Sequence, residues 1–316
     1  MNKIKKFYPI FFLIIFCSFI YYYYQKNLDD FQILKRIDFK IFIQIVFLSF
    51  FYLITEGLIL KNIVSTLKKN MSLIESFFVM NFTYFCNTFI QFTGLGYRVY
   101  YINKKKNIKV SRFIKLSLDT ISCEVFIFSL IGIFSLVFID FSSQKINISE
   151  YIYISFLLFL ILSIIYLLFL VKITKKLKEI LNYFKFYKLD KLFNFFLIVE
   201  ESKKKFYLRQ SLVFLIQYII LFSIFFIILK KLEVNNSLFI SLITTSLVDF
   251  SFLMAFTPYS VGITEFITLL GTKDIPLTFV EIILLINIFR ISMLIIYFIL
   301  GPAFVLFNLV FKKNGM

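Results

Sequence analysis

The chain has 316 residues, of which 60% are hydrophobic and 21% aromatic, and its mean hydropathy is +0.89. Soluble domains are about 45–50% apolar, so this composition excludes a soluble globular protein and predicts an integral membrane protein. The net charge of +17 would suggest nucleic acid in a soluble protein, but here the basic residues lie between apolar runs. We therefore attribute the charge to membrane topology and predict no nucleic-acid partner.

Apolar runs recur along the chain at the length that crosses a hydrocarbon core about 30 Å thick. They lie at 7–24, 41–60, 73–92, 116–139, 151–171, 212–229, 237–256 and 277–310. The first run ends in four tyrosines rather than small residues, which indicates an uncleaved helix. The last run is too long for one span and is expected to kink at Pro302, to tilt or to continue along the interface. Together they predict an all-α polytopic protein with about 6–8 transmembrane helices in a single membrane domain, 1–316.

Two basic stretches orient these segments. Residues 98–115 carry seven Lys or Arg side chains and residues 172–209 carry eleven, whereas the connection between them, 140–150, carries one. The positive-inside rule predicts that both stretches are cytoplasmic loops of a cell-membrane protein and that the C-terminus is cytoplasmic. The second stretch also has apolar residues at helical spacing, which indicates an amphipathic helix on the membrane surface.

The segments 71–97 and 237–271 are predicted to be re-entrant hairpins. They are the most polar of the apolar runs, and each ends in helix-breaking residues: Gly94 and Gly96 in the first, Pro258 and Gly262 in the second. Broken segments that enter from opposite sides, one in each half (1–139 and 151–316), are typical of an inverted-repeat transporter with a site at the midplane. The alternative is two ordinary helices with small polar packing faces.

Charged side chains inside the apolar segments point to a polar interior. Each costs about 2.5–3.5 kcal/mol on insertion scales, so each needs a partner or an aqueous cavity. Arg290 is the strongest candidate for a functional charge inside the membrane, and its expected partner is Glu265 or Asp249. Because a guanidinium binds phosphate through two hydrogen bonds, we expect Arg98 and Arg290 to bind a phosphate headgroup, with Glu265 and Asp249 as counter-charges. The alternative is a structural ion pair that fixes the second hairpin to the last helix.

The remaining intramembrane acids receive no functional role. Asp119 is expected to be solvated or paired with Arg98 or Lys115, and Glu56 and Glu124 are not assigned to a site. With no histidine and no close pair of cysteines, the sequence predicts no metal site, and no motif for a cofactor, phosphate loop or catalytic residue occurs.

Two stretches resemble the membrane region of lysylphosphatidylglycerol synthases and its stand-alone, flippase-like relatives. Residues 87–98, NTFIQFTGLGYR, are similar to the family's Asn, a Pro-Gly-type turn, Gly and then Arg. Residues 258–265, PYSVGITE, followed by Gly271 and Arg290, are similar to Pro-Gly-Gly-x-Gly-x-x-Glu and a downstream Arg. The chain departs from the pattern at Phe92-Thr93, where the first turn usually has proline, and at Tyr259-Ser260, which replace a glycine pair.

The resemblance implies a flippase-like protein that translocates an anionic phospholipid or a lipid-linked saccharide between leaflets. It places Asn87 in the polar cavity with Arg98, Asp249, Glu265 and Arg290, and it implies membrane lipids, anionic or polyprenyl-linked, as partners. The chain has no room for a soluble acyltransferase-like domain, so lipid synthesis is not expected and the protein is not predicted to be an enzyme. Two alternatives stay open: an intramembrane transferase that uses a lipid-phosphate donor, and a non-catalytic subunit bound to cell-envelope biosynthesis partners.

Overall fold

A computed structural model describes residues 37–90, 92–141, 150–169, 203–253, 263–271 and 277–313, and regular structure in these ranges is entirely helical. The helices are α2 (Phe39–Thr66), α3 (Leu73–Phe89), α4 (Thr93–Lys106), α5 (Val110–Phe141), α6 (Glu150–Ile164) with a π-helical turn (Ile165–Phe169), α9 (Lys203–Lys231), α10 (Ser237–Leu253), α11 (Ile263–Gly271) and α12 (Phe279–Lys313). The first apolar run at 7–24, the amphipathic stretch at 172–202 and the turn residues Pro258 and Gly262 lie outside the described residues.

Within the described part of the chain, four helices are long and apolar enough to cross a membrane: α2, α5, α9 and α12. The shorter helices α6 and α10 are also apolar. This confirms the prediction of an all-α polytopic membrane protein. α12 continues without a break through Pro302, so the last apolar run forms one long helix.

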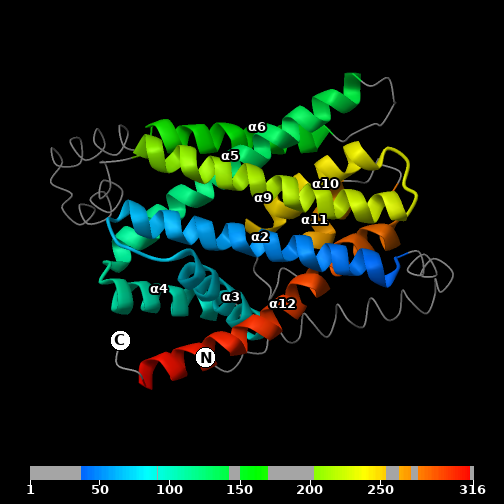
Figure 1. The fold of residues 1–316 in the computed structure, drawn as a ribbon. Helices are drawn as coiled ribbons and strands as arrows, with labels where there is room; N and C mark the ends of the chain where they lie inside the picture. Colours follow the sequence, from blue (N-terminus) through cyan, green and yellow to red (C-terminus); the bar gives the residue numbers. More distant parts are fainter. Residues whose placement is uncertain are drawn as a thin grey trace, which may run out of the picture.

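The first predicted hairpin is formed by α3 and α4, which pack on each other. In Figure 1 α4 runs back alongside α3, so the hairpin leaves from and returns to the end of the molecule where α2 ends and α5 begins. Ser72 caps the start of α3, because its hydroxyl accepts a hydrogen bond from the backbone N–H of Glu75 at 3.0 Å. The second hairpin has α10 as one arm and α11 as the other, and these helices also pack together.

The prediction that residues 98–115 form a basic loop was wrong. Residues 98–106 continue α4, and residues 110–115 begin α5. α4 ends at Asn107, which adopts a left-handed conformation with φ 51°. Lysine is a good helix former and is favourable at a helix C-terminus, so the run Lys104, Lys105 and Lys106 extends α4 instead of ending it. Residues 203–209 of the second basic stretch likewise form the start of α9.

The two halves repeat one order of elements: a long helix, two short helices and a long helix, α2 to α5 and then α9 to α12. Their packing repeats as well, because α2 contacts α3 as α9 contacts α10, and α12 contacts α3 as α5 contacts α10. α2 packs on its counterpart α9 at the centre. In Figure 1 α2 runs from right to left and α9 from left to right, and α5 and α12 are also opposed. This order and these opposed directions are those of an inverted repeat, while the re-entrant character of the two hairpins stays a prediction; α6 packs on α5 outside the repeated set.

Two glycines allow α3 to lie close between α2 and α12. A Cβ at Gly57 of α2 would come within 2.9 Å of the backbone of Phe77, and a Cβ at Gly301 of α12 would come within 2.6 Å of the Phe85 ring. The first hairpin is therefore held directly against two membrane-spanning helices.

Candidate functional site

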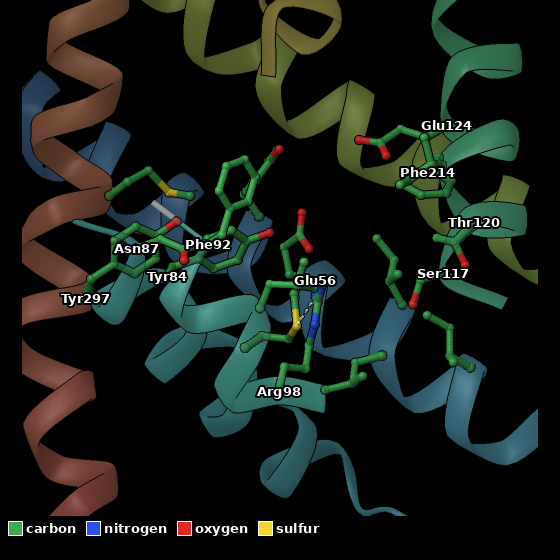
Figure 2. A pocket seen from close by; sticks show the side chains of 18 of the residues that line it. Glu56, Tyr84, Asn87, Phe92, Arg98, Ser117, Thr120, Glu124, Phe214 and Tyr297 are labelled. Carbon is green, nitrogen blue, oxygen red and sulfur yellow. Dashed lines mark hydrogen bonds between the residues drawn. The ribbon is translucent and has the colours of Figure 1, made fainter. Parts of the chain in front are cut away.

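A cavity of about 470 Å³ lies beside the first hairpin and is walled by α2, α3, α4, α5, α9 and α12 (Figure 2). Its charged lining residues are Arg98 of α4, Glu56 of α2 and Glu124 of α5. Other residues that line it are Tyr52, Ile59, Leu60, Ile63, Met80, Tyr84, Asn87, Phe92, Leu95, Ser117, Thr120, Ile121, Phe214, Phe289, Met293 and Tyr297. The cavity is therefore mainly apolar, with a few ionisable groups, as is usual for a ligand site.

Arg98 enters the cavity from the second arm of the hairpin, and Figure 2 shows its guanidinium directed toward Glu56. Its Nη1 lies 3.2 Å from the sulfur of Met80, and its Nε is buried without a hydrogen-bond partner among the described residues. No carboxylate of the described chain lies within 4 Å of it, although Arg98 and Glu56 interact electrostatically. A cationic group with unused donors is thus available to an anionic ligand.

The two carboxylates come from helices on different sides of the cavity. Glu56 is held by Gln217 of α9, whose Nε2 donates to Glu56 Oε1 at 2.7 Å. Glu124 is half-buried on α5 and interacts electrostatically with Glu56. The cavity therefore combines one guanidinium with two carboxylates, which gives it both donors and acceptors for a polar headgroup.

The tip of the hairpin is built around Asn87 and Gly94. Asn87 Oδ1 accepts a hydrogen bond from the backbone N–H of Gly94 at 2.8 Å, so it satisfies one of the first N–H groups of α4. A Cβ at Gly94 would lie 1.8 Å from the carbonyl oxygen of Thr83, whereas a Cβ at Gly96 would meet nothing within 4 Å. Phe92 precedes α4 with φ 68° and lines the cavity, so a strained residue occupies the turn where relatives are expected to have proline.

The base of the hairpin is fixed by Glu75 at the start of α3. Its two carboxylate oxygens accept hydrogen bonds from Tyr101 at 2.8 Å and from Lys106 at 2.7 Å, both on α4. Burial and the hydrogen bond to Glu75 raise the pKa of Tyr101 above its usual range. These contacts hold the two arms together at the basic end of the molecule.

Arg290 and Glu265 form a buried ion pair in the other half of the molecule. Arg290 of α12 donates from Nη1 to one oxygen of Glu265 on α11 and from Nη2 to the other at 3.2 Å. The exposed fractions are 3% for Arg290 and 4% for Glu265. Of the two predicted partners of Arg290, Glu265 is confirmed, and the pair joins the second hairpin to the last helix.

Asp249 belongs neither to the cavity lining nor to the Arg290–Glu265 ion pair. It lies on α10 with 3% of its surface exposed, and its Oδ2 is buried without a hydrogen-bond partner among the described residues. It interacts electrostatically with Glu56 and with Tyr52, both of which belong to the cavity wall. Asp249 therefore does not line the cavity, and its helix α10 packs on α5 of the first half as well as on α9 and α11 of the second.

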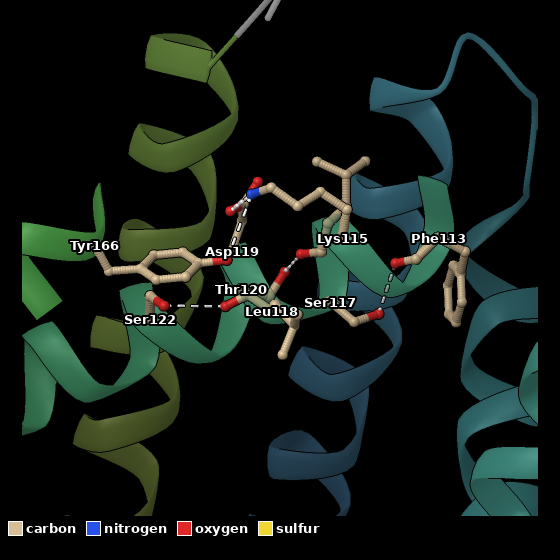
Figure 3. Close-up of polar contacts among 9 residues, drawn as sticks. Phe113, Lys115, Ser117, Leu118, Asp119, Thr120, Ser122 and Tyr166 are labelled. Carbon is tan, nitrogen blue, oxygen red and sulfur yellow. Dashed lines mark hydrogen bonds and ion pairs between the residues drawn. The ribbon is translucent and has the colours of Figure 1, made fainter. Parts of the chain in front are cut away.

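Asp119 forms an ion pair with Lys115, one turn earlier on α5. Lys115 was one of the two partners predicted for it, the other being Arg98. Both side chains are 1% exposed, and Figure 3 shows Tyr166 of the π-helical turn beside them, with its hydroxyl 3.4 Å from the Lys115 ammonium. The cavity-lining Ser117 and Thr120 lie on a different face of α5. This pair serves the packing of α5 on the helix that follows it.

The structure thus brings Arg98 and Asn87 into one cavity, pairs Glu265 with Arg290 elsewhere, and leaves Asp249 outside both. Their roles in substrate binding stay predictions. Sequence reasoning missed Glu56 and Glu124 as site residues. Their positions inside apolar runs were the available signal, but only the packing of the helices shows that both line the same cavity as Arg98.

Comparison with known proteins agrees with the motif resemblance. A family model described as lysylphosphatidylglycerol synthase TM region matches residues 10–301. No curated protein and no solved structure matches the chain. The match spans both hairpins, the cavity and the Arg290 pair. The chain therefore belongs to the lysylphosphatidylglycerol synthase TM region family, and it is a multi-pass membrane protein of lipid-related processes.

Proposed function

We propose that this protein translocates a phosphate-bearing lipid, either an anionic phospholipid or a lipid-linked saccharide, between the leaflets of the cell membrane. The observation that carries the proposal is Arg98: a guanidinium with an unused donor, in a cavity of about 470 Å³ walled by membrane-spanning helices. A cation without a carboxylate within hydrogen-bond distance is costly in an apolar interior, so such a group is retained where an anion visits it.

The cavity chemistry suits a phosphate headgroup. Arg98 offers the planar fork of donors that matches phosphate oxygens, and the N-terminus of α4 places the positive end of its dipole at the hairpin tip. Glu56 and Glu124 accept hydrogen bonds from the hydroxyl or amine groups that make up the rest of a headgroup. Phe92, Leu95 and Ile121 are exposed apolar side chains at the cavity and suit the first methylene groups of acyl chains.

The location of charge suggests how the lipid enters. Lys104, Lys105 and Lys106 at the end of α4 share one end of the molecule with Arg112 of α5 and the start of α9 (Figure 1). By the positive-inside rule this end is cytoplasmic. Each Lys or Arg near the surface attracts anionic headgroups by about 1 kcal/mol, so the basic end concentrates anionic lipid near the first hairpin.

The second hairpin provides the exit in this proposal. In inverted-repeat transporters, two broken segments that enter from opposite sides open alternately to the two faces of the membrane. We assign that role to α3–α4 on the cytoplasmic side and α10–α11 on the outer side. Arg290, held by Glu265 while the outer path is closed, then becomes a second phosphate ligand when the pair separates.

Leaflet exchange in liposomes tests the proposal. The full-length protein is reconstituted with fluorescent phosphatidylglycerol or a fluorescent polyprenyl-phosphate sugar, and dithionite reports the fraction in the outer leaflet. We expect the protein to move at least one of the two probes far faster than protein-free liposomes do. Exchange of neither probe, together with a new glycosylated or acylated product, would replace translocation by a transferase function; exchange of neither probe and no product would favour a scaffold subunit.

A further inference from the structure

Asp249 is a buried carboxylate that the proposed headgroup path does not use. Its exposed fraction is 3%, and Oδ2 lacks a hydrogen-bond partner among the described residues. No Lys or Arg side chain of the described chain lies within 4 Å of it. An isolated carboxylate in an apolar interior is costly, and the usual means of removing that charge is a bound proton.

Among the residues that the structure describes, further acids lie near Asp249, and no Lys or Arg side chain pairs with it. α5 contributes Glu124, α2 contributes Glu56 and Tyr52, and α9 contributes Tyr218, all of which interact with it electrostatically. The acid on α11 is Glu265, and the guanidinium of Arg290 is bound to it. Like charges repel strongly at low dielectric, so a proton bound by one of these carboxylates would relieve the repulsion among them.

The position of Asp249 connects the two halves of the repeat. α10 packs on α5 of the first half and on α9 and α11 of the second. Tyr52, at the middle of α2, interacts with both Asp249 and Glu56, and Tyr52 and Glu56 line the cavity at the first hairpin. Asp249 is therefore linked electrostatically to the cavity wall, and its helix packs against the other arm of the second hairpin.

We propose that lipid translocation is coupled to proton movement, with Asp249 as the residue that carries the proton between the two halves. This inference rests on the proposed translocation function and adds its energy source. The step is a proton transfer alone: an O–H bond forms on the Asp249 carboxylate as the donor's O–H bond breaks, and release to water on the opposite side reverses it. Neutral Asp249 lets the second hairpin move through the apolar interior without an unpaired charge, whereas charged Asp249 holds it.

The test measures the steady-state distribution of fluorescent phosphatidylglycerol in proteoliposomes that carry a pH gradient of about one unit. With one proton per lipid, such a gradient supports up to about a tenfold enrichment of the probe in one leaflet. Reversing the gradient should reverse the enrichment. D249N should equalise the probe between leaflets whatever the gradient, because an amide binds no proton in this range.

Asp38 provides the matched control. It is an exposed acid at the N-cap of α2, and asparagine caps a helix as well as aspartate does, so D38N should keep the full enrichment. If D249N moves no lipid, the D249E variant shows whether a carboxylate at this position carries the proton. Enrichment of the probe in D249E supports this role, and equal leaflets in D249E would overturn it. Equal leaflets in wild type under both gradients, with exchange still fast, would overturn the coupling and leave translocation standing. No exchange of the probe at all would remove translocation, and the coupling with it.

Discussion

Arg98 is the side chain on which the proposed function depends most, because it is the one positively charged residue among the described residues that line the cavity. Replacing it by lysine keeps the charge but removes the planar fork, so R98K should slow leaflet exchange of fluorescent phosphatidylglycerol by about tenfold. R112K is the matched control, since Arg112 is exposed at the start of α5 outside the cavity. Equal rates in R98K and R112K would show that Arg98 does not bind the headgroup through its fork.

A second prediction at this scale concerns the glycines of the hairpin tip. G94A forces a Cβ to 1.8 Å from the Thr83 carbonyl oxygen, and overpacking against backbone costs about 3 kcal/mol or more. G96A meets nothing within 4 Å and should change stability by less than about 1 kcal/mol. Thermal denaturation in detergent measures both variants. A Tm for G94A as high as that of G96A would mean that the tip is not packed as described.

Single residues were the hardest part of the site to predict from the sequence. Glu265 was one of two predicted partners of Arg290, because Arg290 lies in an apolar run and Glu281, nine residues earlier, is on the opposite face of the helix. Glu56 and Glu124 were passed over, since helical spacing describes one helix and not which helices are neighbours. Their presence in the same cavity as Arg98 depends on how α2, α4 and α5 are arranged around it.

Among the elements, the second hairpin and α12 depend on the buried pair. Breaking such a pair leaves an uncompensated charge and costs about 3–5 kcal/mol, whereas replacing both partners by apolar residues is often nearly neutral. We therefore expect R290M to lower the Tm strongly and the double variant R290M/E265M to recover most of the loss.

The double variant also distinguishes the two possible roles of Arg290 in the leaflet-exchange assay. A stable but inactive protein supports a phosphate ligand, and an active one leaves the pair purely structural.

The elements themselves were predicted with uneven success. The polar content of α3 and α10 and the breakers after them indicated both hairpins, and the structure has helical arms at both places. The extent of α4 was missed because its lysine run looks like a solvated loop, although lysine extends helices well. The π-helical turn that follows α6 has no signature in apolar periodicity.

For the whole molecule, the account predicts that the first hairpin enters and leaves on one side of the membrane. In a variant without Cys17, Cys86 and Cys123, single cysteines at Asn70 and Lys109 flank this hairpin at exposed positions. Both should react with a membrane-impermeant maleimide only from the cytoplasm. A cysteine at Asn235, which is also exposed, should react only from outside. Labelling of the Asn70 and Lys109 sites from opposite sides would show instead that the segment crosses the membrane.

In the proposed function, the lipid headgroup passes through the cavity beside α4. Ser117, which lines this cavity, allows that path to be tested directly. Ser117 lines the cavity on α5, so a single cysteine there in the cysteine-free protein can be alkylated with a bulky maleimide. The account predicts fast leaflet exchange of fluorescent phosphatidylglycerol by unmodified S117C and a fall to the protein-free rate after alkylation. Exchange at an undiminished rate with the cavity filled would contradict it.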